Sequence, residues 1–194
     1  MKKHKRYTVG FRRKREGKTN YRRRLKLVKG RKLRLVVRPS SKNIVVQLVE
    51  YNEAGDRVIV SAHSKEIVKM GWKANCGNLP TAYLVGLLVG KKSAAKGLKD
   101  AVLDIGMGSP VNSSRYFAAL KGAVDAGLDI RHSEEVLPSD DRISGKHIAD
   151  YAKQLVKEKE VYNKRFSSYL KKNLKPEELE KHFKDIKVKV EGKK

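Results

Sequence analysis

The first 34 residues carry a positive charge so dense that they cannot form a hydrophobic core of their own. They contain 17 Lys or Arg residues and one acid, Glu16, so their net charge is +16 of the chain's +25. Residues 35–130 hold 12 basic and 8 acidic side chains, and residues 131–194 hold 17 and 12, as solvated surfaces do. The charge therefore predicts a basic arm over residues 1–32. Because burial cannot offset its ordering entropy, we expect the arm to be disordered in the free protein.

A basic segment of this kind can be a solvated tail, a membrane-surface segment or a nucleic-acid-binding arm. A membrane-surface helix needs an apolar face at helical spacing, whereas the aromatic residues here are scattered among the charges without a stripe. The guanidinium group of arginine can donate two hydrogen bonds to one phosphate, and Tyr and Phe rings stack on unpaired bases. This composition favours an arm that binds RNA.

Cysteine content and hydropathy indicate the compartment. The single cysteine, Cys76, cannot form an internal disulfide, which agrees with a reducing cytosol. The longest apolar run, AYLVGLLVG at 82–90, has nine residues, about half of what a membrane-spanning helix needs. The N-terminus also lacks the apolar region of a secretory signal. We therefore expect a soluble, cytoplasmic protein.

After the arm, the sequence changes to short segments rich in β-branched residues. LRLVVR at 33–38, NIVVQLVEY at 43–51 and RVIVSAHS at 57–64 are separated by turn-forming residues. This pattern predicts a three-stranded antiparallel meander. Strands this continuously apolar are usually covered on both faces, so we expect helices to pack on the sheet.

Two helices and a further strand follow. NLPTAYLVGLLVGKKSAAK at 78–96 predicts a helix, KDAVLDIG at 99–106 a fourth strand, and SSRYFAALKGAVDAGLDI at 113–130 a second helix that ends at Gly127. The order β-β-β-α-β-α predicts an α/β core domain over residues 33–130.

The helical residues beyond this domain form a C-terminal extension over residues 131–194. GKHIADYAKQLVKEKEVYNKRFSSYLKKNL at 145–174 is helical in pattern, and PEELEKHFKDI at 176–186 begins a last short helix. These helices have little apolar surface, so we expect them to dock on the core domain or on a partner.

Two glycine motifs resemble phosphate-binding loops. GLLVGKKS at 86–93 has three residues between its glycines where a phosphate-cradling loop has four, and it lies inside an apolar helix. Ala82, Gly86 and Gly90 instead fall on one helical face, which predicts close packing of this helix on the sheet. The second motif, GMGS at 106–109, follows a strand but lacks the third glycine of a dinucleotide fingerprint. We interpret it as a tight turn.

Metal and catalytic constellations are not found in the sequence. The five His residues are dispersed and Cys76 has no second cysteine, so no zinc site is expected. A metal-dependent nuclease needs several carboxylates on central strands. Glu50 is the one acid of the first three predicted strands and Asp104 lies in the fourth, which is too few for two metals. We predict no catalytic residue, no metal ligand and no cofactor.

Four segments resemble one family. RYTVGFRRKREGKTNYRRRLKLV at 6–28, TAYLVGLLVGKK at 81–92, RYFAALKGAVDAGLDIRHS at 115–133 and GKHIADYAKQLVKEKEVYNKRFSSYLKKNLKPEELEKHF at 145–183 look like the large-subunit ribosomal protein that binds 5S ribosomal RNA. It is the family numbered eighteenth in bacteria and fifth in eukaryotes. Bacterial members end near the second helix and eukaryotic members have a longer tail, so the form resembles the archaeal one.

The resemblance implies a mixed sheet of the ribonuclease H-like arrangement with the fourth strand beside the first, and it implies no catalysis. The implied partners are 5S rRNA, the large-subunit rRNA and a second 5S-associated ribosomal protein of the central protuberance. The implied place is the large ribosomal subunit in the cytoplasm. The arm would neutralise phosphates along 5S rRNA while the folded domain presents a shaped surface to the same RNA.

The residues predicted to contact RNA are Lys and Arg, which would bind phosphates, and Tyr and Phe, which would stack on bases. They are Lys2, Lys3, Lys5, Arg6, Tyr7, Phe11, Arg12, Arg13, Arg15, Lys18, Tyr21, Arg22, Arg23, Arg24 and Lys26. Two other functions stay open on the residues alone: a non-ribosomal RNA-binding or RNA-processing factor, and a phosphoryl-transfer or nuclease enzyme.

Overall fold

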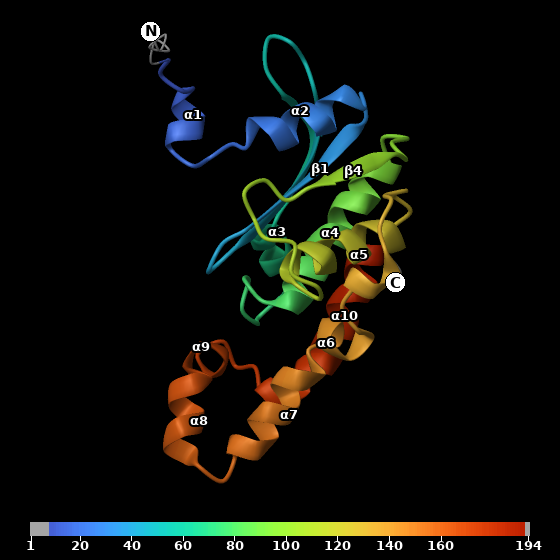
Figure 1. Ribbon diagram of the computed structural model, residues 1–194. Coiled ribbons are helices and arrows are strands. Elements are labelled where there is room, and N and C mark those ends of the chain that lie inside the picture. The colour runs from blue at the N-terminus through green and yellow to red at the C-terminus, as the bar shows by residue number, and fades with distance from the viewer. Residues whose placement is uncertain (1–7, 193–194) are drawn as a thin grey trace, which may run out of the picture.

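A computed structural model describes residues 8–192, and a four-stranded sheet lies at its centre (Figure 1). The strands are β1 (Leu33–Pro39), β2 (Ile44–Glu50), β3 (Arg57–His63) and β4 (Ala101–Asp104). Their order is β3-β2-β1-β4. β2 pairs antiparallel with both β1 and β3, while β4 pairs parallel with β1. The predicted α/β class, the meander and the fourth strand beside the first, as in the ribonuclease H-like arrangement, are confirmed.

Helices α4 (Leu79–Ala94) and α5 (Arg115–Asp125) pack together on one face of the sheet (Figure 1). The Asn78 side chain caps α4 by accepting a 3.0 Å hydrogen bond from the Thr81 amide, which satisfies one of the free N–H groups at a helix start. α4 is apolar on nearly every side because it is surrounded by the sheet, α5 and the C-terminal helix. Its fully buried neighbours on the strands are Leu35, Val37, Ile44, Val46 and Leu48.

Glycines bring the backbones of α4 and α5 into contact. A Cβ atom on Gly86 would collide with the backbone of Ala119, and one on Gly122 would collide with the carbonyl oxygen of Tyr83. A Cβ atom on Gly90 would collide with Ala126, just beyond α5. The prediction that Gly86 and Gly90 of α4 face the sheet is therefore wrong. They face α5, because that helix offers small residues of its own at the crossing.

The C-terminal region returns to the core domain through α10 (Leu179–Glu191), which runs along α4 (Figure 1). Phe183, Ile186 and Val190 of α10 are buried in the same core as α4. The elements that precede α10 are η1 (Glu134–Val136), α6 (Asp140–Ser144), α7 (Lys146–Leu155), α8 (Lys159–Arg165), α9 (Ser167–Leu170) and η2 (Pro176–Glu178). The expected docking on the core domain is thus confirmed for α10.

The segment expected to be helical over 145–174 is divided into α7, α8 and α9. Phe166 ends α8 with a non-helical φ of −101° and is buried. Its ring packs against Tyr151, Tyr162 and Tyr169 at centroid distances of 6.1, 5.3 and 5.8 Å. The chain turns at this aromatic cluster because the turn buries rings that a straight helix would leave in water.

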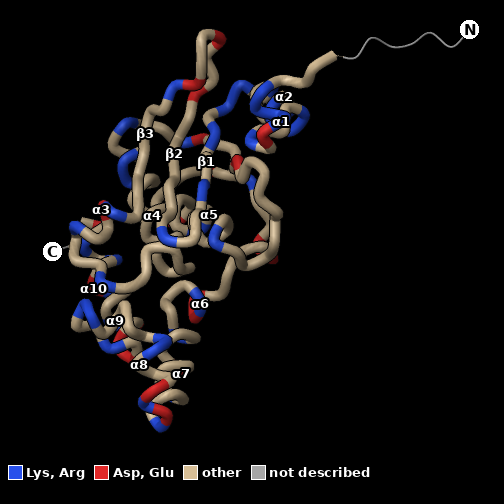
Figure 2. Tube along the Cα trace, turned by 90° about the vertical axis from the view of Figure 1, so that its left-hand side faces the viewer, with Lys and Arg blue, Asp and Glu red and all other residues tan. Residues whose placement is uncertain are grey.

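Several short helices were not predicted: α1 (Arg12–Arg15), α2 (Tyr21–Lys29) and α3 (Ser64–Lys69), together with η1 and α6. α1 and α2 lie beside one end of β1, at the opposite end of the molecule from α7–α9 (Figure 2). The expectation of a disordered arm therefore differs from the structure for residues 12–15 and 21–29. The reason is that the arm is partly neutralised, since Asp56 of the core domain binds Arg24 of α2.

Candidate nucleic-acid interface

The helix α2 separates its residues into a half-buried side and an exposed side. Tyr21, Arg24, Leu27 and Val28 are half-buried. On the other side, basic residues recur at the three- and four-residue spacing that forms one helical stripe. This exposed stripe consists of Arg22, Lys26 and Lys29, with Leu25 beside them.

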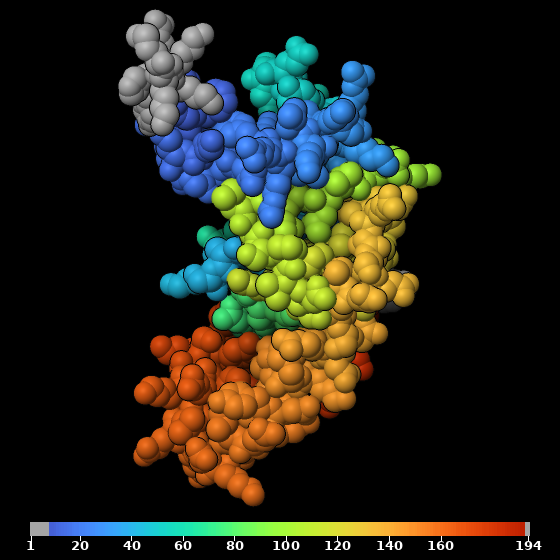
Figure 3. Space-filling view, in the orientation of Figure 1, coloured from blue at the N-terminus to red at the C-terminus, as the bar shows by residue number. Residues whose placement is uncertain are grey.

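The helix α1 adds four consecutive basic residues, Arg12–Arg15, all of them exposed. Their charge is balanced in part by Glu16, which lies 2.8 Å from Lys18 Nζ and 3.7 Å from Arg12 Nε. The space-filling view shows α1 and α2 as a continuous ridge of projecting side chains across one end of the molecule (Figure 3). The two helices, whose exposed residues are mostly basic, therefore lie next to each other at this end of the molecule.

The turn between α1 and α2 is fixed by local contacts. Gly17 has a φ of +65°, which only glycine adopts without strain. Arg13 Nε donates a 2.9 Å hydrogen bond to Thr19 Oγ1, and the Asn20 side chain caps α2 by accepting from the Arg23 amide at 3.1 Å. These contacts set the angle between the two helices.

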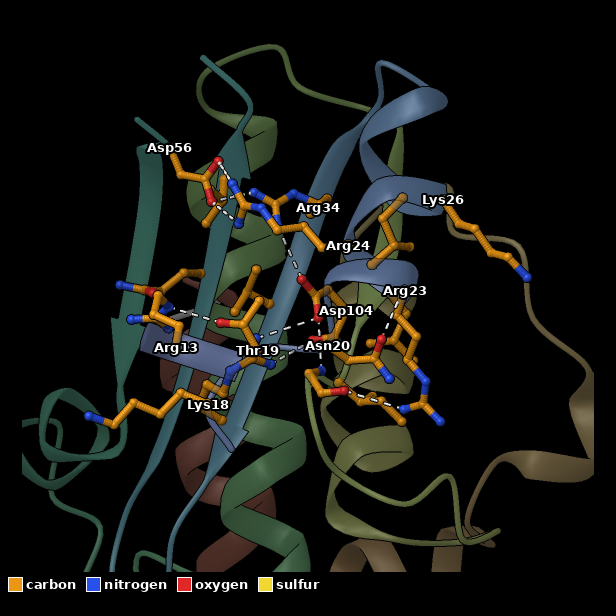
Figure 4. Close-up of a pocket in the computed structure, with 18 of the residues that line it drawn as sticks. Arg13, Lys18, Thr19, Asn20, Arg23, Arg24, Lys26, Arg34, Asp56 and Asp104 are labelled. Carbon is orange, nitrogen blue, oxygen red and sulfur yellow. Dashed lines mark hydrogen bonds and ion pairs between the residues drawn. The ribbon is translucent and has the colours of Figure 1, made fainter. Parts of the chain in front are cut away.

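An ion pair attaches α2 to the core domain (Figure 4). Arg24 Nη1 and Nη2 lie 2.7 and 2.8 Å from the two carboxylate oxygens of Asp56, the residue just before β3. This is the two-pronged geometry that arginine forms best with a carboxylate. Arg34 Nη2 lies 2.7 Å from the same carboxylate, on Oδ2. Asp56 therefore joins α2 to β1.

The network continues into the buried end of the sheet. Arg34 is 3% exposed, and its Nη1 lies 3.2 Å from Asp104 Oδ2 on β4. Asp104 Oδ1 accepts from the Gly106 amide at 2.8 Å and lies 3.4 Å from Arg38 Nη2. Arg23 Nη1 donates to the Gly106 carbonyl oxygen at 3.3 Å. Thus α2 is joined to the core domain both at Asp56 and at the turn after β4.

The charges of this network shift the pKa of two of its members. Burial alone would raise the pKa of Asp56, but hydrogen bonds from Arg24 and Arg34 outweigh burial and hold it below the ordinary aspartate value. The hydrogen bond to Asp56 raises the pKa of Arg24. Both groups are therefore charged at neutral pH.

A cavity of about 530 Å³ lies between the arm and the sheet face opposite α4 and α5 (Figure 4). Arg34, Val36 and Arg38 point to this face because side chains alternate along β1. Arg13 and Lys18 line the arm side. Basic groups thus surround a floor that is partly apolar.

The predicted RNA-contact residues fall into three groups. Lys2, Lys3, Lys5, Arg6 and Tyr7 lie outside the described residues. Arg24 is bound to Asp56, while Tyr21 is half-buried and its ring centroid lies 5.1 Å from that of Phe11. The remaining predicted residues are exposed in the arm: Phe11, Arg12, Arg13, Arg15, Lys18, Arg22, Arg23 and Lys26.

Sequence reasoning missed Lys14, Lys29 and Asp56; Lys14 is exposed in α1 between predicted residues. Lys29 belongs to the exposed stripe of α2, and helical spacing from Arg22 and Lys26 would have identified it had this helix been predicted. Asp56 gave no signal, because an acid in a turn after a glycine is usually solvated.

Within residues 8–192, no cluster of three or more His, Cys, Asp or Glu side chains could hold a metal ion. No helix in the same range has the length and apolarity needed to cross a membrane.

A comparison with protein families finds a match to RNA-associated ribosomal proteins, as the basic surface suggests. The family model described as ribosomal large subunit proteins 60S L5, and 50S L18, matches residues 5–101 and 95–133. The match includes α1, α2, the whole sheet and α5, and it extends over more than half of the 194 residues. The chain therefore belongs to the family of ribosomal large-subunit proteins 60S L5 and 50S L18.

Proposed function

We propose that this protein is a structural constituent of the large ribosomal subunit that binds 5S rRNA. It helps to attach 5S rRNA to the large-subunit rRNA in the central protuberance, next to a second 5S-associated ribosomal protein. Family membership supports the ribosomal role, and the sequence resemblance supports 5S rRNA as the ligand and an archaeal-type member working in the cytoplasm.

The observation that carries this proposal is the exposed basic stripe of α2, held on the core domain by the Arg24–Asp56 ion pair. The exposed cations of α1 stand next to it, and Lys2, Lys3, Lys5, Arg6 and Tyr7 extend the arm in sequence. Lysine and arginine neutralise phosphates and release counterions from RNA. Phe11, which is 70% exposed, is placed to stack on an unpaired base.

Binding and co-sedimentation test the proposal together. The protein should bind 5S rRNA more tightly than a transfer RNA of similar length at the same salt concentration, and it should co-sediment with large ribosomal subunits. Binding to RNA without co-sedimentation would favour the alternative, a non-ribosomal RNA-binding or RNA-processing factor.

Substitution of the stripe locates the interface. Changing Arg22, Lys26 and Lys29 together to Gln should weaken 5S rRNA binding and flatten its salt dependence, because each lost phosphate contact lowers the log-log slope by about 0.7–0.9. Gln at the exposed Lys65, Lys69 and Lys73, around α3, gives the same change in net charge away from the arm. Equal losses in both variants would contradict a local interface.

A further inference from the structure

The helix α2 is held on the protein by charge as well as by apolar contact. The apolar contribution is limited, because Tyr21, Leu27 and Val28 are only half-buried, none of the helix residues is fully buried and Leu25 is 69% exposed. Its exposed side carries like charges that repel one another. An isolated nine-residue helix is also too short to be stable in water by itself. The ion pair between Arg24 and Asp56 is therefore a large part of what fixes α2 in place.

Asp56 neutralises two guanidinium groups at once. Arg24 reaches it from α2 and Arg34 from β1, and the three Nη–Oδ distances are 2.7–2.8 Å. Arg34 is almost fully buried and receives its second carboxylate from Asp104. Without Asp56, Arg24 would face Arg34 without an intervening negative charge, and the two would repel. Asp56 thus converts a repulsive contact between arm and sheet into an attractive one.

We infer that Asp56 is a positioning residue for RNA binding: it holds α2 against the sheet, so that the exposed stripe of Arg22, Lys26 and Lys29 is already in place before RNA arrives. Arg24 acts through Asp56 and does not contact the RNA. This inference rests on the proposed function for its ligand. It extends that function, because it assigns an acidic residue a favourable part in binding a polyanion.

The direction in which one substitution changes the affinity for RNA distinguishes a positioning role of Asp56 from a simple charge effect. Asp56→Asn removes a negative charge, so charge alone predicts tighter binding to RNA. Positioning predicts weaker binding: if the docked arm falls to about one tenth of the population, the apparent Kd rises about tenfold. Glu53→Gln is the matched control, since Glu53 lies in the same β2–β3 turn, is exposed and makes no ion pair with any described residue. It should bind as tightly as the wild type or more tightly.

Hydrogen exchange tests the same inference without RNA. In the free protein, Asp56→Asn should speed amide exchange across α2 by about tenfold or more and leave the amides of α4 protected, whereas Glu53→Gln should change neither. If the wild type fails to bind 5S rRNA but Asp56→Asn still frees α2, the proposed ligand is wrong and the docking role stands. If Asp56→Asn leaves exchange and affinity unchanged, or binds RNA more tightly, the positioning role is overturned.

A second variant decides the question if Asp56→Asn does not fold. Arg24→Gln leaves the Asp56–Arg34 pair intact and removes only the arm's side of the contact. It should weaken binding while keeping the wild-type salt slope, because Arg24 makes no phosphate contact. The exposed Arg22→Gln should lower that slope by about 0.7–0.9. A drop of this size in Arg24→Gln would show that Arg24 contacts RNA and would overturn the inference.

Discussion

At the scale of single residues, the helix crossing at Gly86 determines how closely the core packs. An alanine inside a helix is ordinarily more stable than glycine by roughly 0.5–1 kcal/mol. At Gly86 the sign should reverse, because the added methyl group would collide with the backbone of Ala119. The backbone cannot move aside as the end of a flexible side chain can.

We therefore expect Gly86→Ala to lower the free energy of unfolding by about 1–3 kcal/mol, measured by chemical denaturation. Gly30→Ala is the control, because its φ is −73° and its nearest neighbour, the Leu27 carbonyl oxygen, would lie 3.6 Å from the new methyl group. That variant should be neutral or slightly more stable. An unchanged Gly86→Ala protein would contradict the close helix contact.

His182 should make stability depend on pH. Its Nε2 accepts a 3.1 Å hydrogen bond from the Lys73 amide, and its ring stacks on Trp72 at a centroid distance of 5.0 Å. Burial, together with the charges of Lys73 and Lys189, lowers the pKa of His182, although Asp185 opposes the shift. Its neutral form is therefore the one that fits the folded protein.

Because the folded-state pKa is lowered, this contribution should be fully present above about pH 6.5, the ordinary histidine pKa. It should be lost as the pH falls through the folded-state value. Trp72, the one tryptophan of the chain, can report the titration by fluorescence. The free energy of unfolding should fall less between pH 7 and 5 in His182→Gln than in the wild type. Equal losses would exclude His182 as the titrating group.

At the scale of elements, the strands and α4 could be predicted because short-range pattern determines them. Runs of β-branched residues such as LRLVVR favour strands, and their apolar side chains are buried when the sheet is covered. Asn78 and Pro80 mark the start of α4. The helix α2 has a local signal, since Asn20 can cap it and Tyr21, Arg24 and Val28 recur at helical spacing, but its docking on the sheet could not be predicted from its own residues. Its docking depends on Asp56, which is 32 residues away from Arg24 in sequence, and no local pattern encodes that pairing. The crossing partner of Gly86 was missed for the same reason.

The helix α10 should contribute to the stability of the whole core domain. Phe183 is 5% exposed and its ring centroid lies 5.8 Å from that of Tyr83 in α4. Phe183→Ala should lower the free energy of unfolding by about 3–5 kcal/mol, measured in the same denaturation experiment. Val188→Ala, at a position of the same helix that is 45% exposed, should have little effect. A loss confined to α10 amides, with global stability unchanged, would show that α10 unfolds independently.

At the scale of the whole molecule, most of the net positive charge and most of the hydrophobic core lie in different parts of the chain. Residues 1–34 carry a net charge of +16, which leaves +9 for the remaining 160 residues. The arm covers the sheet face opposite α4 and α5, so the main core does not depend on it.

Deleting residues 1–24 removes 12 basic residues and one acid. The truncated protein should fold, lose most of its affinity for 5S rRNA at moderate salt and show a much flatter salt slope. A salt titration of binding, with circular dichroism to check folding, measures both effects. A truncated protein with unchanged affinity and slope would place the RNA site on the core domain.

The pairing of arm and carboxylates also has a consequence for synthesis of the chain. Asp56 is made 32 residues after Arg24. At about 5–20 residues per second, this interval lasts roughly 2–6 s. During that time the cations of the arm have been made but the carboxylate that holds Arg24 has not. Docking of α2 on the sheet can therefore begin only after the turn before β3 has been synthesised.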